Sequence, residues 1–168
     1  MKYTINTLVL LLVLTVSAVA QSYSHEESND RANLYVGFTN ISVPFDNFQG
    51  INGQAQVKLV RFGVVRIDVA GDLAVFFPGG IGDVELYTFQ AGPRAGVDIG
   101  KKVTLFGGIH FGAFTTFNSD ATYSYLPGGG IQVKLNKRVY VQGEYGRQFL
   151  QDAPFSFNRL SFGVGGRF

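Results

Sequence analysis

Apolar and polar residues alternate with a period of two along most of this chain, and the clearest run extends without a break over residues 65–77. Within it, Val69 and Leu73 alternate with Asp68 and Asp72. Because successive side chains of a β-strand point to opposite faces, this run predicts a strand with one apolar and one mixed face. Its thirteen residues exceed the roughly 5–6 of a typical soluble strand and the roughly 9–11 that cross a bilayer when tilted. The chain is therefore expected to be all-β, with long strands.

Eight segments show this alternation, and they lie at 33–43, 51–60, 64–77, 84–97, 102–115, 122–135, 138–149 and 157–168. Tight turns are expected near 61–63, 98–101 and 136–137, each with a turn-forming residue, namely Gly63, Gly100 and Asn136. Longer loops are expected near 44–50, 78–83, 116–121 and 150–156. Short turns at one end and longer loops at the other are typical of outer-membrane barrels. We therefore predict the fold class as all-β, an eight-stranded antiparallel up-and-down transmembrane β-barrel.

The start of the chain has the features of an export signal. Lys2 provides a positive charge, and residues 8–20 form an apolar run that is shorter than the about 20 residues of a membrane-spanning helix. The small residues Ala18 and Ala20 favour cleavage before Gln21, with an uncleaved N-terminal anchor as the alternative. No other apolar run is long enough for a membrane helix, so a membrane location would require a closed barrel. We expect a signal peptide at 1–20, a polar tail at 21–32 and an outer-membrane barrel domain at 33–168.

The composition excludes several classes of protein. Hydrophobic residues make up 46% and charged residues 15%, which argues against a disordered chain. The absence of cysteine excludes a disulfide framework and a thiolate metal site. A formal net charge of +2 gives no reason to expect nucleic acid as a partner. The two histidines, His25 in the tail and His110 within a strand, leave the loops without a histidine base. We expect no enzymatic activity, no catalytic residue, no cofactor and no metal.

If the apolar face of the strands points to lipid, the mixed face must line the lumen. That face carries a luminal polar cluster made of Arg66, Asp68, Asp72, Arg94, His110, Gln132, Lys134, Gln142 and Glu144. An eight-stranded barrel is about wide enough for its own side chains, and an unpaired buried charge is costly. We therefore expect these charges to plug the lumen, with Arg66 and Arg94 finding partners among Asp68, Asp72 and Glu144. Two alternatives stay open: a narrow porin-like channel for small solutes, and a secreted soluble barrel that binds an apolar ligand on an inward apolar face.

Three segments carry a resemblance to a known family. The final residues, RLSFGVGGRF, are similar to the C-terminal strand of bacterial outer-membrane barrels. The segments LYTFQAGPRAGV (86–97) and LPGGGIQVKLNKRVYVQGEY (126–145) resemble small stand-alone members of the OmpA-type outer-membrane β-barrel domain family. The likeness covers nearly all of 33–168. The chain departs from the family in having no Trp for the interfacial girdle. It also ends with the barrel, so we expect the peptidoglycan-binding domain of longer members to be missing.

The resemblance implies a location and a set of partners. It places the protein in the outer membrane of a Gram-negative-type cell after signal-peptide export, in contact with outer-membrane lipid. It also implies that Phe168 is an assembly signal, read by the barrel-assembly machinery through the C-terminal strand. The function that we predict is a structural or surface-interaction role, exerted through the loops, for a barrel whose lumen is plugged by charged side chains. The sequence names no surface ligand.

Overall fold

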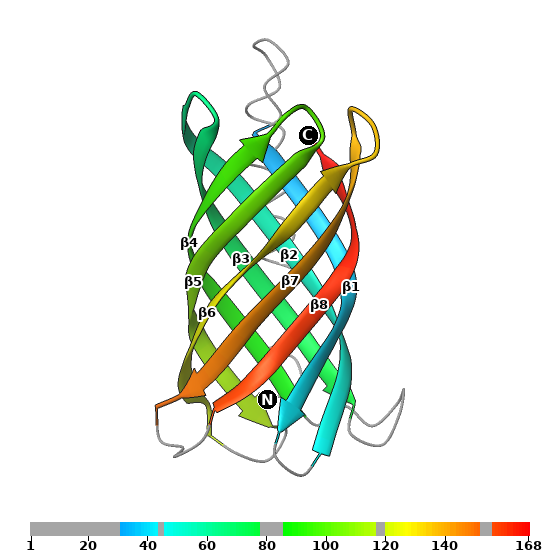
Figure 1. Cartoon of the computed structure of the whole chain (residues 1–168). Coiled ribbons are helices and arrows are strands. Elements are labelled where there is room, and N and C mark those ends of the chain that lie inside the picture. Colours follow the sequence, from blue (N-terminus) through cyan, green and yellow to red (C-terminus); the bar gives the residue numbers. More distant parts are fainter. Residues whose placement is uncertain (1–30, 44–45, 78–85, 117–119, 152–155) are drawn as a thin grey trace.

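The computed structural model describes residues 31–43, 46–77, 86–116, 120–151 and 156–168, and in them the chain forms a closed barrel. Its strands are β1 (Ala32–Val43), β2 (Asp46–Phe62), β3 (Val65–Phe77), β4 (Leu86–Ile99), β5 (Val103–Thr116), β6 (Thr122–Lys134), β7 (Val139–Leu150) and β8 (Ser156–Arg167). Each strand pairs antiparallel with the next, and β8 pairs with β1 to close the barrel (Figure 1). The predicted fold, an eight-stranded antiparallel up-and-down barrel, is confirmed. No helix in the described part of the chain is both long and apolar enough to cross a membrane.

Three tight turns lie together at one end of the barrel, which is the end that also holds the C-terminus (Figure 1). Gly63 and Gly100 adopt positive φ angles of 60° and 63°, a conformation that favours glycine over residues with a Cβ atom. In the third turn, the Asn136 side-chain oxygen accepts hydrogen bonds of 2.8 Å from the backbone N–H groups of Arg138 and Val139. The three predicted turn formers are therefore correct. We call this end the turn end and the opposite end the loop end.

The predicted strand limits lie within two residues of those in the structure, except at the start of β2. The loop predicted at 44–50 is wrong over most of its length, because residues 46–50 extend β2 and pair with β1, with Asp46 opposite Val43 and Phe48 opposite Ile41. Backbone pairing continues there although the sequence pattern fades. The described residues do not include the predicted signal peptide, nearly all of the predicted tail and much of the other predicted loops. Ala32, the last residue of the predicted tail, begins β1.

Polar side chains point into the barrel and apolar side chains point out of it. On β3, Asp68 and Asp72 are almost completely buried, whereas Val69 between them is 41% exposed. On β8, Leu160, Phe162 and Val164 are each more than half exposed. The predicted assignment of the two strand faces is therefore correct. An inward apolar face, which a soluble barrel needs, is the reverse of what the described strands show.

A β-bulge in β2 changes which side chains point inward near the turn end. The pairing with β3 shifts between Lys58 and Val60, so Leu59 is the extra residue. Before the bulge, Lys58 lies opposite Asp68, and after it Arg61 lies opposite Arg66. Because both partners on β3 face the lumen, the bulge turns Arg61 toward the mouth of the barrel.

A cluster of apolar side chains fills the lumen near the loop end. Ile41, Ala74, Phe76 and Phe157 form a buried cluster, with Phe48, Leu86, Phe114 and Leu150 packed against it. These residues come from every strand except β6. The rings of Phe114 and Phe157 lie 5.4 Å apart. We call this set the loop-end cluster, and it borders the polar interior, the part of the lumen that holds most of the buried polar side chains.

Candidate functional site

The polar interior is built from inward-facing positions of all eight strands, and its side chains contact one another in groups along the barrel axis. At the mouth on the turn end, Arg61 forms an ion pair of 2.9 Å with Asp98. The Thr104 hydroxyl donates a hydrogen bond of 2.5 Å to the same carboxylate. Asp98 is buried, whereas the Arg61 side chain is 64% exposed. This pair therefore marks the boundary between the interior and the surroundings.

The next group contains Arg66, Asp68 and Gln132. The Arg66 Nε atom lies 3.1 Å from the Asp68 carboxylate, and both side chains are almost completely buried. A terminal nitrogen of Arg66 also donates a hydrogen bond of 2.9 Å to the Gln132 side-chain oxygen. Arg66 thus has an acidic partner from the set that the sequence suggested. A buried pair of this kind is neutral as a unit but leaves a costly charge behind if either member is removed.

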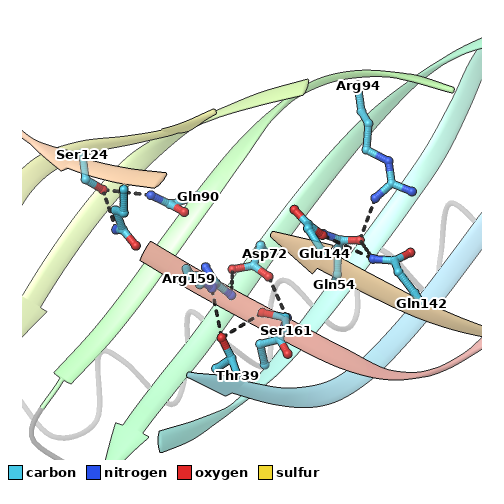
Figure 2. Close-up of polar contacts among 12 residues, drawn as sticks. Thr39, Gln54, Asp72, Gln90, Arg94, Ser124, Gln142, Glu144, Arg159 and Ser161 are labelled. Carbon is cyan, nitrogen blue, oxygen red and sulfur yellow. Dashed lines mark hydrogen bonds and ion pairs between the residues drawn. The ribbon is translucent and has the colours of Figure 1, made fainter. Parts of the chain in front are cut away.

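The centre of the lumen holds a group that we call the Arg94 cluster, made of Gln54, Gln56, Arg94, Gln142 and Glu144. The oxygen of Gln54 accepts hydrogen bonds of 3.0 Å from both Arg94 and Gln142 (Figure 2). Gln54 and Gln142 each donate a hydrogen bond of 3.3 Å to the Glu144 carboxylate. The Arg94 guanidinium also lies 3.5 Å from the centre of the Phe106 ring. Arg94 therefore reaches Glu144 through Gln54. The sequence predicted a partner for Arg94 among Asp68, Asp72 and Glu144 and did not assign which of them.

A second group, the Arg159 cluster, lies nearer the loop end and contains Thr39, Asn52, Asp72, Arg159 and Ser161. Arg159 forms an ion pair of 2.7 Å with Asp72, and both side chains are almost completely buried (Figure 2). The Asn52 amide donates a hydrogen bond of 3.1 Å to the same carboxylate. The Thr39 hydroxyl accepts hydrogen bonds from Arg159 at 3.1 Å and from Ser161 at 2.8 Å. Both oxygens of Asp72 therefore have partners within the barrel.

In the Arg66 group, the Arg94 cluster and the Arg159 cluster taken together, positive and negative side chains are equal in number. Arg66, Arg94 and Arg159 provide three positive charges, and Asp68, Asp72 and Glu144 provide three negative charges. Amide and hydroxyl side chains fill much of the remaining space, as in the contacts of Gln90 and Gln148 with the Ser124 hydroxyl at 3.0 and 3.3 Å (Figure 2). Some buried polar atoms have no hydrogen-bond partner among the described residues, including two guanidinium nitrogens of Arg94 and the amide nitrogen of Gln132.

The structure places every residue of the predicted luminal cluster on the inner side of the barrel. Seven of them are buried, namely Arg66, Asp68, Asp72, Arg94, His110, Gln132 and Gln142. Lys134 and Glu144 are partly buried. His110 stands apart from the hydrogen-bonded groups, since neither ring nitrogen has a partner among the described residues. Phe168 lies at the turn end, where its backbone exchanges hydrogen bonds of 2.9 and 3.1 Å with Ala32.

Sequence reasoning missed several members of the interior, above all Arg159 and the side chains of β2 (Asn52, Gln54 and Gln56). The sequence feature that could have identified them is their position in the alternation of inward-facing and outward-facing residues. Arg159 and Ser161 alternate with the outward-facing Leu160 and Phe162, so they had to point inward. On β2, the amides alternate with the small residues Gly53 and Ala55, which gives little contrast in hydrophobicity.

In the part of the chain that the structure describes, no group of three or more His, Asp or Glu side chains is placed to hold a metal ion. The buried carboxylates of Asp68 and Asp72 form ion pairs with arginine side chains, and Asp72 also accepts a hydrogen bond from an amide. The loop-end cluster lies between these carboxylates and the loop end of the barrel. What this arrangement does chemically is link side chains from different strands through ion pairs and hydrogen bonds.

Neither a family model nor a curated protein matches the sequence. Solved structures do match. Neisserial surface protein A (NspA) has a TM-score of 0.56 at 14% identity, over 82% of this chain and 96% of that one. Ail, the attachment invasion locus protein of Yersinia pestis, has a TM-score of 0.55 at 17% identity, over 82% of this chain and 98% of that one. Outer membrane protein H (OprH) of Pseudomonas aeruginosa has a TM-score of 0.54 at 15% identity, over 81% of this chain and 99% of that one. The chain therefore has the fold of the small eight-stranded outer-membrane β-barrels, the fold that its resemblance to the OmpA-type barrel domain predicted.

Proposed function

We propose that this chain is an outer-membrane protein with a structural or surface-interaction role and a lumen closed to solutes. The observation that carries the proposal is the polarity of the barrel: charged side chains are buried inside, and large apolar side chains cover the outside. In water, an apolar exterior of this extent would drive aggregation, whereas in a bilayer it is the favourable surface. The closed barrel also leaves no unpaired strand edge, as a lipid environment requires.

The closed lumen is supported by two layers of side chains. The Arg66 group and the Arg94 and Arg159 clusters fill the interior with charges that neutralise one another. The loop-end cluster adds a layer of aromatic and aliphatic side chains from seven strands. A hydrated ion would have to break buried ion pairs and also pass this apolar layer, and both steps are costly. A plug accounts for these contacts better than a narrow channel does.

The test of this proposal uses two measurements on the same protein. Fractionation should recover the chain in the outer membrane, with a gel mobility that changes on heating because folded barrels resist detergent at room temperature. Purified protein in a planar bilayer should then pass no steady ionic current. Recovery from the soluble fraction would contradict the membrane location, and a steady porin-like current would contradict the plug and support the channel alternative.

We also propose that Phe168 is read by the barrel-assembly machinery. Support comes from its position: its backbone pairs with Ala32, where the first and last strands meet. Its ring is 63% exposed, so it is not a core residue that packing alone would explain. Deleting Phe168 should lower assembly in cells more than it lowers folding into liposomes in vitro, without altering cleavage after Ala20. Equal losses in the two assays would contradict the role as a signal.

A further inference from the structure

The outer surface of the barrel has a groove over β6, β7, β8 and β1. Its main part has a volume of about 600 Å³ and is lined by apolar side chains that include Val36, Phe38, Ile131, Val141, Phe162 and Val164. A second hollow of about 290 Å³ continues it toward the loop end and shares Ile131, Gly143 and Phe162 with the first. Tyr145 and Leu160 extend the lining there. The two hollows form one groove along the strands.

Gly143 makes this groove. It lies on the outward face of β7, opposite Ile131 of β6 and Phe162 of β8. The two flanking side chains are 43% and 61% exposed, so they stand out from the barrel on either side of a position without a side chain. A Cβ atom at Gly143 would meet no other atom within 4 Å. The result is an apolar slot about two strand spacings, roughly 9–10 Å, across from β6 to β8.

The turn end of the groove is positively charged. The turn between β6 and β7 holds Lys137 and Arg138, which are exposed and lie three to four residues from Val141 in the groove wall. At about 3.4 Å per residue, that places the two cations roughly 10–14 Å along the strand from the wall. The only other charged residues of the described tight turns, Lys101 and Lys102, are also basic and exposed. A ligand in the groove would therefore have an apolar part along β7 and a negative group at the turn.

We propose that the groove binds one acyl chain of an anionic phospholipid, with the phosphate held by Lys137 and Arg138. The lining offers carbon atoms along its length, which suits a hydrocarbon chain and not a headgroup. Lysine and arginine form charge-assisted hydrogen bonds with phosphate oxygens at the polar edge of the bilayer. The inference rests on the proposed membrane location, and it adds a specific lipid site to it.

The experiment uses the protein folded into vesicles of equal parts phosphatidylglycerol and phosphatidylcholine, extracted in mild detergent and analysed by native mass spectrometry. The unchanged protein should retain one lipid, with phosphatidylglycerol enriched about fivefold or more. Phosphatidylglycerol has a net negative charge near the two cations, whereas the positive choline group of phosphatidylcholine offsets its phosphate. Gly143→Phe fills the slot and should lower retention of both lipids about tenfold, the loss expected when contact with about two methylene groups is removed.

Gly71→Phe is the matched control for the slot. Gly71 also faces outward with nothing within 4 Å of an added Cβ atom, but it lies on β3 between Ala55 and Ala91, away from the groove. Lipid retention should stay unchanged there. Gly143→Val and Gly71→Val form a smaller pair that keeps the comparison if a phenylalanine prevents folding, which the heat-modifiable gel mobility reports.

The charge variants test the other half of the site. The double variant Lys137→Gln and Arg138→Gln should abolish the preference for phosphatidylglycerol and leave phosphatidylcholine retention unchanged. The matched double variant at Lys101 and Lys102 should keep the preference. Equal effects of the two pairs would overturn the proposal in favour of general attraction to a basic surface.

Other outcomes are equally clear. Equal lipid retention in the Gly143 and Gly71 variants would overturn the proposal, as would a protein that inserts into vesicles but retains no lipid. A dimer that Gly143→Phe disrupts would assign the groove to a second copy of the chain and also overturn it. Failure to insert into vesicles of any composition would instead contradict the membrane location itself, so the two failures are distinguishable.

Discussion

On β3, Asp68 and Asp72 are almost completely buried, whereas Val69, the residue after Asp68, is 41% exposed. The two faces of one strand thus follow opposite rules. Inside, a side chain is tolerated when its charge has a partner, as Asp72 has in Arg159 and Asn52. Outside, a side chain is tolerated when it is apolar. A substitution on the inner face should therefore cost an amount set by the partner left behind, and one on the outer face an amount set by its depth in the bilayer.

Removing one member of a buried ion pair should have the largest effect. Asp72→Ala leaves Arg159 buried without its carboxylate, and we expect a loss of about 3–5 kcal/mol in the free energy of unfolding, measured by urea titration in vesicles. Combining it with Arg159→Met should restore most of that loss, because the unpaired charge is then gone. Asp120→Asn, at an exposed position, is the control. If Asp72→Ala lowers the free energy of unfolding no more than this control does, the buried ion pair does not have the stabilising role described.

A charge on the outer face should cost less, and its cost should depend on depth. Val69→Arg should lower the free energy of unfolding in vesicles by about 2–4 kcal/mol, whereas Val65→Arg at the turn end of the same strand should cost about 0–1 kcal/mol. Both residues face outward and are exposed to a similar extent, 41% and 38%. Equal costs at the two positions would mean that depth in a bilayer does not govern the outer face.

The contact between Arg94 and Phe106 tests a weaker interaction of the interior. Phe106→Leu removes the ring 3.5 Å from the guanidinium and should cost about 2 kcal/mol in the same unfolding assay, since the cation there is shielded from water. Phe111→Leu, on the outer face of the same strand, exchanges one apolar side chain for another and should cost little. Similar losses at both positions would show that the ring contributes volume alone.

The smallest effect is expected at a turn, where neither rule applies because water reaches the backbone. Asn136→Ala removes the acceptor for the N–H groups of Arg138 and Val139 and should cost about 1 kcal/mol in the free energy of unfolding. Asn136→Asp keeps an oxygen at that place and should recover most of the loss. If both variants behave alike, the side-chain acceptor does not stabilise the turn.

The strands and their faces could be predicted because alternate side chains of each barrel strand face the inside and the outside, which gives the sequence a period of two. That signal is strong where aliphatic and charged residues alternate, as on β3. It fades at residues 46–50, where Asn47 and Gln49 alternate with Phe48 and Gly50, and the predicted loop there proved wrong. Pairing with β1 extends β2 through this segment because backbone hydrogen bonds do not depend on side-chain contrast.

The contacts inside the lumen could be predicted only in part. The alternation shows which residues point inward, but the stagger of the strands decides which of them meet across the barrel. Gln54 of β2 contacts Glu144 of β7, and Arg159 of β8 contacts Asp72 of β3, although neither pair of strands is adjacent in the sheet. The bulge at Leu59 also reverses the alternation locally, so that Arg61 joins Asp98 at the mouth. No local sequence pattern contains this information.

The most direct test of the account measures which face of a strand touches lipid. The chain contains no Trp, so a single introduced Trp reports one position without background. Val69→Trp places it on the outer face and Phe106→Trp on the inner face. With both proteins folded into vesicles that contain brominated phospholipids, we expect strong quenching of the fluorescence for Val69→Trp and little for Phe106→Trp. Equal quenching at the two positions, or none at Val69→Trp, would contradict a barrel that spans the bilayer with its charges inside.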